Sequence, residues 1–150
     1  MKAVVQRVQS ASVLVEGTTI SSIGKGCLVL LGVHVDDEPE DLEWLVGKVA
    51  RLRIFSDAAG VMNCSVNEVG GAILVVSQFT LYASTKKGNR PSYIAAARPE
   101  KAVPMYEKFV EMLEKELGNK VLTGSFGADM QVNLVNDGPV TIVIDSRNKD

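Results

Sequence analysis

Short apolar segments recur along the chain and predict a protein built mainly of β-strands. Near the N-terminus apolar and polar residues alternate, which favours strands with one buried face, whereas later segments are apolar at almost every position. Two of these continuous segments, residues 27–33 and 72–76, are typical of strands buried on both faces. The predicted strands comprise residues 3–8, 12–16, 18–23, 27–33, 53–55, 72–76, 121–123, 130–135 and 140–144.

Apolar residues recur at helical spacing in two segments. The first predicted helix covers residues 39–52, with Asp36 and Asp37 as candidate N-caps. The second helix starts near Pro99 and Pro104 and ends at a Gly-Asn pair. The apolar stripes are Leu42, Leu45, Val46 and Val49 in the first helix and Met105, Phe109, Met112 and Leu113 in the second.

The balance of strands and helices decides the predicted fold class. Two helices are too few for a doubly wound sheet, so we expect an α+β fold with a barrel-like, largely antiparallel sheet and the two helices packed outside. A chain of 150 residues that is 46% hydrophobic is long enough to form its own core, and no repeat or linker divides it. Residues 1–150 are therefore expected to form a single domain.

The cysteines and the hydrophobic segments bear on cellular location. No apolar segment approaches the ~20 residues that a membrane helix needs, and the N-terminus has no secretion-signal pattern. Cys27 and Cys64 lack metal-binding spacing, so we expect both to be buried, reduced thiols. Reduced thiols are typical of a cytoplasmic protein, which is the location we expect.

Charge is distributed unevenly along the chain, although the net charge is only −2. Residues 69–99 contain no acidic residue but include Lys86, Lys87, Arg90 and Arg98. Such a basic segment can hold a few phosphates without giving the protein a general affinity for nucleic acid. The alternative is an ordinary solvated loop.

The end of the strand at residues 72–76 carries candidate chemistry. Ser77, Gln78 and Thr80 form a polar cluster there, and the N–H groups of Phe79 and Thr80 could stabilise a developing oxyanion. Thr80 is a conceivable nucleophile, but no activating base accompanies it in the sequence. The only histidine, His34, is interpreted as a structural residue at a strand end. The alternative is that the hydroxyls satisfy backbone groups at the strand end.

A second unusual segment is Asn136-Asp137-Gly138-Pro139-Val140-Thr141 between two predicted strands. Asp137 and Gly138 suit a turn, and Pro139 removes a backbone donor, which leaves two carbonyls with a single N–H between them. An X-Pro bond is also the one kind of peptide bond for which the cis form is readily accessible. The simpler interpretation is a turn that reverses the chain.

Together, Ser77-Gln78-Phe79-Thr80-Leu81 and the segment from Asn136 to Thr141 closely resemble the D-aminoacyl-tRNA deacylase (D-Tyr-tRNA deacylase) family. The resemblance extends over essentially the whole chain, including residues 2–8 and 89–92. It implies a homodimeric, barrel-like domain. It also implies an enzyme, an ester hydrolase that removes D-amino acids, or glycine from a mischarged tRNA, and spares L-aminoacyl-tRNA in translation quality control.

Roles for individual residues follow from this resemblance. It implies that Gly138 and Pro139 form a cis pair that enters the partner's pocket and selects chirality, and that Arg7 holds this turn. Ser77, Gln78, Phe79 and Thr80 would line the pocket as catalytic residues, and neither a metal nor a cofactor is implied. The candidate tRNA contacts are Lys86, Lys87 and Arg90.

Two alternatives to this function remain open at the level of sequence. One is a non-catalytic RNA-binding dimer, in which the Gly138-Pro139 turn only seals the interface. The other is an enzyme of inverted selectivity, which would follow if the Gly138-Pro139 bond were trans and its carbonyls turned away.

Overall fold

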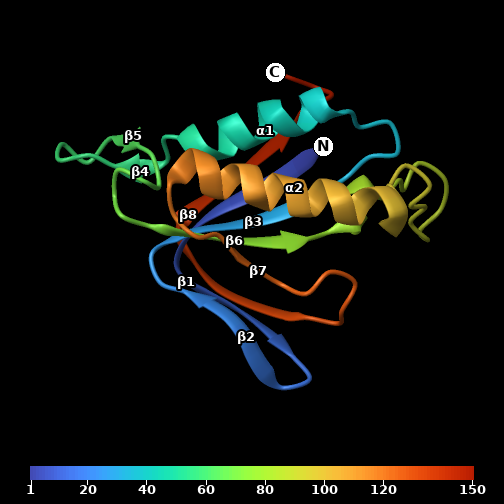
Figure 1. Ribbon diagram of the computed structural model, residues 1–150, viewed down its shortest axis with the longest axis horizontal. Helices are drawn as coiled ribbons and strands as arrows, with labels where there is room; N and C mark the ends of the chain where they lie inside the picture. The colour runs from blue at the N-terminus through green and yellow to red at the C-terminus, as the bar shows by residue number, and fades with distance from the viewer.

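The computed structural model describes residues 1–150 and contains one large sheet, two long helices and a small hairpin (Figure 1). Neither helix is long and apolar enough to cross a membrane. In chain order the elements are β1 (Lys2–Val15), β2 (Thr18–Ile23), β3 (Gly26–Gly32), α1 (Pro39–Arg51), β4 (Phe55–Ser56), β5 (Met62–Cys64), β6 (Ala72–Ser77), the short 3₁₀ helix η1 (Phe79–Tyr82), α2 (Pro99–Leu117), β7 (Leu122–Thr123) and β8 (Gln131–Asp145).

The large sheet is barrel-like and mixed, and β1 is its central strand. β1 pairs antiparallel with β2, β3 and β8, which agrees with the expected antiparallel sheet. The pairs β3–β6 and β6–β7 are parallel, which the sequence interpretation did not anticipate. Parallel neighbours require a crossover connection, and α1 and α2 lie in these two crossovers.

Apolar residues of the sheet form cores on both of its faces. Alternate residues of β3 face opposite ways, so Val29 joins the core beneath the helices while Leu28 joins a smaller core on the other face. In β6, Val75 and Leu74 divide in the same way. Figure 1 shows α1 and α2 together on one side of the sheet, while β2, β7 and part of β8 curve away on the other. The prediction of two doubly buried strands is therefore confirmed.

The N-terminus of α1 differs from the prediction. Glu38, rather than Asp36 or Asp37, is the N-cap, and its N–H donates to the Asp41 carboxylate at 2.9 Å. Asp37 is instead buried, where it accepts hydrogen bonds from the Met1 ammonium group at 2.6 Å and from the His34 N–H at 2.7 Å. The sequence pattern could not reveal this partner because Met1 is 36 positions away.

Several other boundaries also differ from the prediction. The first two predicted strands are one strand, β1, and the last two are one strand, β8. Pro104 lies inside α2, which starts at Pro99 and ends at Leu117, and Gly118 follows as a C-cap in a left-handed conformation. Cys27 is buried as expected, whereas Cys64 is only half-buried, and both thiols are free.

The buried ion pair of Met1 and Asp37 leads to a prediction about stability. In Asp37→Asn the Met1 ammonium group would lose its carboxylate partner while both groups remain fully buried. We expect the free energy of unfolding to fall by about 3 to 5 kcal/mol, measured by urea denaturation. Asp36→Asn is the control, because the Asp36 side chain is 70% exposed and its removal should cost less than about 1 kcal/mol. Equal losses in the two variants would contradict this account.

Candidate active site

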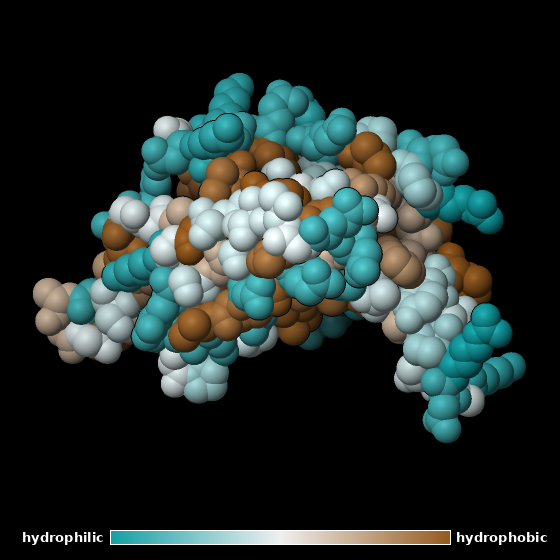
Figure 2. All heavy atoms as spheres, turned by 90° about the horizontal axis from the view of Figure 1, so that it is seen from below, coloured by the Kyte–Doolittle hydropathy of each residue, from teal (hydrophilic) through white to brown (hydrophobic).

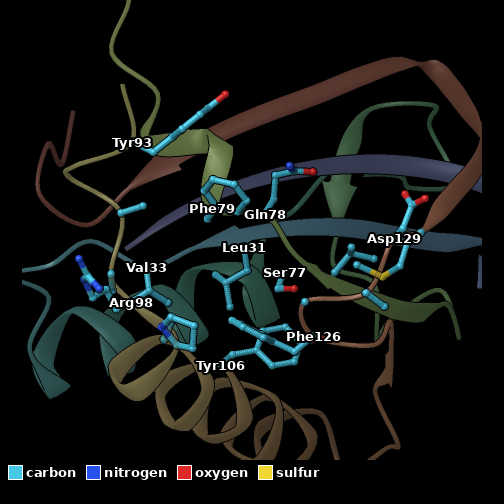
Figure 3. A pocket seen from close by; sticks show the side chains of 18 of the residues that line it. Leu31, Val33, Ser77, Gln78, Phe79, Tyr93, Arg98, Tyr106, Phe126 and Asp129 are labelled. Atoms are coloured by element: carbon cyan, nitrogen blue, oxygen red, sulfur yellow. The ribbon is translucent and has the colours of Figure 1, made fainter. Parts of the chain in front are cut away.

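A cavity of about 630 Å³ opens at the ends of β3 and β6, beside the first turn of α2 (Figure 3). Its lining is mostly apolar, with a few polar groups, which is the usual composition of a small-molecule site. The polar and charged side chains that line it are Ser77, Gln78, Tyr93, Arg98, Tyr106 and Asp129.

The predicted polar cluster lies at this cavity. Ser77 ends β6, and the Gln78 N–H donates to the Leu31 carbonyl of β3 at 2.8 Å. The chain then tightens into η1, in which the Phe79 side chain is 57% exposed and lines the cavity. As the first N–H groups of a 3₁₀ helix, those of Phe79 and Thr80 have no acceptor within the helix. The lining of the cavity therefore combines a hydroxyl, an amide and the N–H of Phe79, and the Thr80 N–H follows one residue further along the chain.

Thr80 is placed differently from its neighbours. Its hydroxyl accepts a hydrogen bond from the Gln78 side-chain amide, and Thr80 is not among the residues that line the cavity. His34, the only histidine, accepts a hydrogen bond from the Asp36 N–H through Nδ1 and packs edge-on against Tyr82. These contacts agree with the structural role expected for His34. Thr80 consequently has no histidine to activate it.

Buried Tyr82 anchors the other end of η1. Burial, reinforced by the nearby Asp37 and Asp145 carboxylates, raises the pKa of Tyr82, so its hydroxyl stays neutral at physiological pH. Burial also raises the pKa of Cys27 to about 12, against a smaller opposing effect of Arg7. The Cys27 thiol is therefore protonated and is not a nucleophile.

Some lining residues were missed by the sequence interpretation. Tyr93 packs edge-on against Phe79, with ring centroids 5.1 Å apart, and Tyr106 packs edge-on against Phe126 at 5.8 Å. The Tyr106 hydroxyl donates to the Val75 carbonyl at 2.8 Å, and burial raises the pKa of Tyr106 to about 12. Helical spacing from Phe109 could have revealed Tyr106. No sequence signal marked Asp129, which lies across the cavity from Arg98 in Figure 3.

The Gly138-Pro139 segment is a bulge within β8 and not a turn that reverses the chain. β8 continues antiparallel to β1 on both sides of it, and the pairing breaks between Gln6 and Val8 of β1. The Gly138-Pro139 bond is cis, so the trans geometry required for inverted selectivity is absent. Both residues are exposed, and neither lines the cavity.

Arg7 holds this bulge within the same chain. Its Nε donates to the Asp137 carbonyl at 3.1 Å, and its Nη1 donates to the Ile54 carbonyl at 2.7 Å. The Asp137 carboxylate is also 3.5 Å from Nε. The arginine therefore connects the bulge to the segment that precedes β4.

The predicted basic residues lie outside the cavity. Lys86, Lys87 and Arg90 are exposed in the loop between η1 and α2, and Ser84 and Ser92 pair at its base. Figure 2 shows this end of the molecule as a projection of hydrophilic residues. Tyr93, on the same loop, reaches the cavity lining, so the loop connects the basic residues to the cavity.

Together, the fold and the cavity define an enzyme-type site for a small organic group, with backbone donors beside it. Residues 4–145 match the family described as D-Tyr-tRNA(Tyr) deacylase, and the chain belongs to that family. The resemblance seen in the sequence is thus confirmed. D-aminoacyl-tRNA deacylases of Flavobacterium johnsoniae and Bacteroides thetaiotaomicron are 62% and 60% identical to it over 150 residues, which is the full length of each chain.

Two solved structures are similar to this fold. One, described as a c-Myc DNA unwinding element binding protein, has a TM-score of 0.90 and 47% identity and covers 97% of this chain and 98% of its own. The other, described as a probable eukaryotic D-amino acid tRNA deacylase, has a TM-score of 0.82 over 96% of this chain and 98% of its own. At 19% identity, this second likeness concerns the fold alone.

The crowding around Gly138 leads to a prediction about the bulge. Gly138 has a φ of +127°, and an added Cβ would lie 2.9 Å from Arg7 Nη2, which hydrogen bonds keep from moving freely. We expect Gly138→Ala to lower the free energy of unfolding by about 1 to 3 kcal/mol, measured by thermal or urea denaturation. Gly60→Ala is the control, since Gly60 also has a positive φ but has open space around it. A smaller loss at Gly138 than at Gly60 would show that Arg7 moves aside without cost.

Proposed function

We propose that this protein hydrolyses the ester bond of D-aminoacyl-tRNA, releasing the free D-amino acid and tRNA and leaving L-aminoacyl-tRNA intact. The observation that carries the proposal is the cavity floor formed by Ser77, Gln78 and the start of η1, in a chain of the D-Tyr-tRNA(Tyr) deacylase family. The cavity is large enough for an amino acid joined to a terminal nucleoside. The proposed setting is chirality proofreading during translation in the cytoplasm.

The chemistry proposed is attack by water on the ester carbonyl carbon. The N–H groups of Phe79 and Thr80 donate to the oxyanion of the tetrahedral intermediate, while Ser77 and Gln78 position the substrate. The bond from the carbonyl carbon to the 3′ oxygen then breaks, and this oxygen takes a proton, with the adjacent 2′-hydroxyl assisting. Water is favoured over Thr80 as nucleophile because the Thr80 hydroxyl faces Gln78 and has no base beside it.

Chirality selection is proposed to require a homodimer. Gly138 and Pro139 do not line their own cavity, so as selectivity residues they would enter the partner's cavity. In β8, Val135 and Val143 are 50% and 64% exposed, one on each side of the bulge, and would be covered in such a dimer. Figure 2 shows hydrophobic residues across the middle of the face that is seen from below.

The proposed filter is the pair of carbonyl groups of Gly138 and Pro139, which would accept D-aminoacyl-tRNA and reject L-aminoacyl-tRNA. They would accept hydrogen bonds from the substrate's α-ammonium group and leave no space where an L side chain projects. Glycine has no side chain and would pass. Glycine on a mischarged tRNA is therefore a second proposed substrate.

A comparison of three substrates tests the proposed function. At equal enzyme concentration we expect release from D-Tyr-tRNA and Gly-tRNA, and release from L-Tyr-tRNA at least about 100-fold slower, because a clash with a rigid wall costs several kcal/mol. Acid-gel or thin-layer analysis of charged tRNA measures each rate. Release from none of the three would favour the non-catalytic RNA-binding dimer instead. Equal release of D-Tyr and L-Tyr would refute the proposed filter.

The basic loop is proposed to contact phosphates of the acceptor stem. In the double variant Lys86→Glu and Lys87→Glu we expect KM for D-Tyr-tRNA to rise at least about 5-fold, with kcat nearly unchanged and a weaker dependence of kcat/KM on salt. The matched control reverses Lys115 and Lys120, exposed lysines near the C-terminal end of α2. An unchanged KM in the loop variant would rule out this contact.

A further inference from the structure

The bulge in β8 is unusually long for the strand it faces. Gln6 pairs with Thr141 and Val8 pairs with Asn136, so the four residues 137–140 lie opposite the single residue Arg7. A bulge of this length leaves Gly138 and Pro139 without a pairing partner on β1. Its shape must therefore be fixed by side chains.

Asn136 supplies two of the bonds that fix the bulge. Its side-chain Nδ2 donates to the Val140 carbonyl at 2.9 Å and to the Arg7 carbonyl at 2.9 Å. The first bond joins the two ends of the bulge directly, and the second ties the bulge to β1. An amide has two N–H donors on Nδ2, and here both are used. Asn136 is half-buried, so water competes only partly for these bonds.

Arg7 and Asn136 bind different parts of the bulge. Arg7 holds the carbonyl of Asp137, on the side where the chain leaves the ladder. Asn136 joins the two ends of the bulge, and its side-chain amide also donates to the backbone carbonyl of Arg7. The two residues therefore stabilise each other's position. All of these bonds are made within one protomer, which leaves the Gly138 and Pro139 segment exposed at the tip.

We propose that Asn136 is a positioning residue for chirality selection, because its side-chain amide closes the base of the bulge and thereby sets where the Gly138 and Pro139 carbonyls point. This inference rests on the proposed function. Asn136 touches no substrate and acts through the bulge alone. A bulge that rejects L side chains must be rigid, because a mobile bulge would move aside and admit the L side chain.

The test uses Asn136→Ala and the isosteric Asn136→Asp in the full-length protein. Both variants lose the two Nδ2 donor bonds, and the second conserves the size of the side chain. We expect kcat/KM for D-Tyr-tRNA to fall about 10- to 100-fold and the ratio of D-Tyr to L-Tyr release to fall at least about 10-fold. Hydrogen exchange of the peptide that covers residues 134–142 should become faster in both.

The matched control is Asn119→Ala. The Asn119 amide also donates to two acceptors, Asn67 Oδ1 at 3.0 Å and the Leu117 carbonyl at 3.5 Å, but beyond the end of α2. It should lose stability without a change in the D to L ratio. Wild-type activity with an unchanged ratio in both Asn136 variants would overturn the inference alone. If the wild type itself released no D-Tyr, the proposed function would fail and the inference with it.

Discussion

Antiparallel pairing between β1 and β8 is the constraint on which the proposed selectivity depends. The ladder runs from Lys2 opposite Asp145 to Leu14 opposite Gln131 and is interrupted only near its middle. Apolar residues on both sides of the interruption face the core, so neither half can slip by one residue without exposing its buried face. The extra residues of β8 therefore have to leave the ladder as a bulge.

Parallel pairing between β3 and β6 has a comparable effect on the cavity. Leu31 and Ser77 are in register, so both strands end at the same edge of the sheet. The crossover through α2 then brings the start of that helix, with Arg98 as its N-cap and Ala102 in its first turn, to this edge. The cavity is consequently built from strand ends, a 3₁₀ helix and a helix start, all of which are held by the rigid sheet.

Hydrophobic spacing and backbone preferences in the sequence predicted the features that depend only on neighbouring residues. The two doubly buried strands, the helix from Pro39 and the left-handed Gly118 cap follow from hydrophobic spacing and backbone preferences. Sequence alone does not separate the bulge from a reversing turn, because Asp137 and Gly138 give the same local signal in both. Only the pairing of β1 with the whole of β8 distinguishes the two.

Long-range features of the site could not be predicted in this way. Tyr93 and Asp129 meet at one cavity from different loops, and the bond from Asn136 to Arg7 joins residues 129 positions apart. The family motif did locate Ser77 to Phe79 at the cavity and Arg7 at the bulge. It placed Thr80 beside them, whereas the Thr80 hydroxyl is bound to Gln78 and lies outside the lining.

The geometry of β3 supports a division of the proposed site between two protomers. Arg7, which holds the bulge, is paired with Cys27 near the start of β3, whereas Leu31 near its end lines the cavity. Four residues of extended strand span about 13 Å, and the strand between them is buried on both faces. A protomer therefore cannot bring its bulge into its own cavity without breaking the sheet. In the proposed homodimer a two-fold partner would supply the bulge instead, because a symmetric interface would give each cavity the bulge of the other chain.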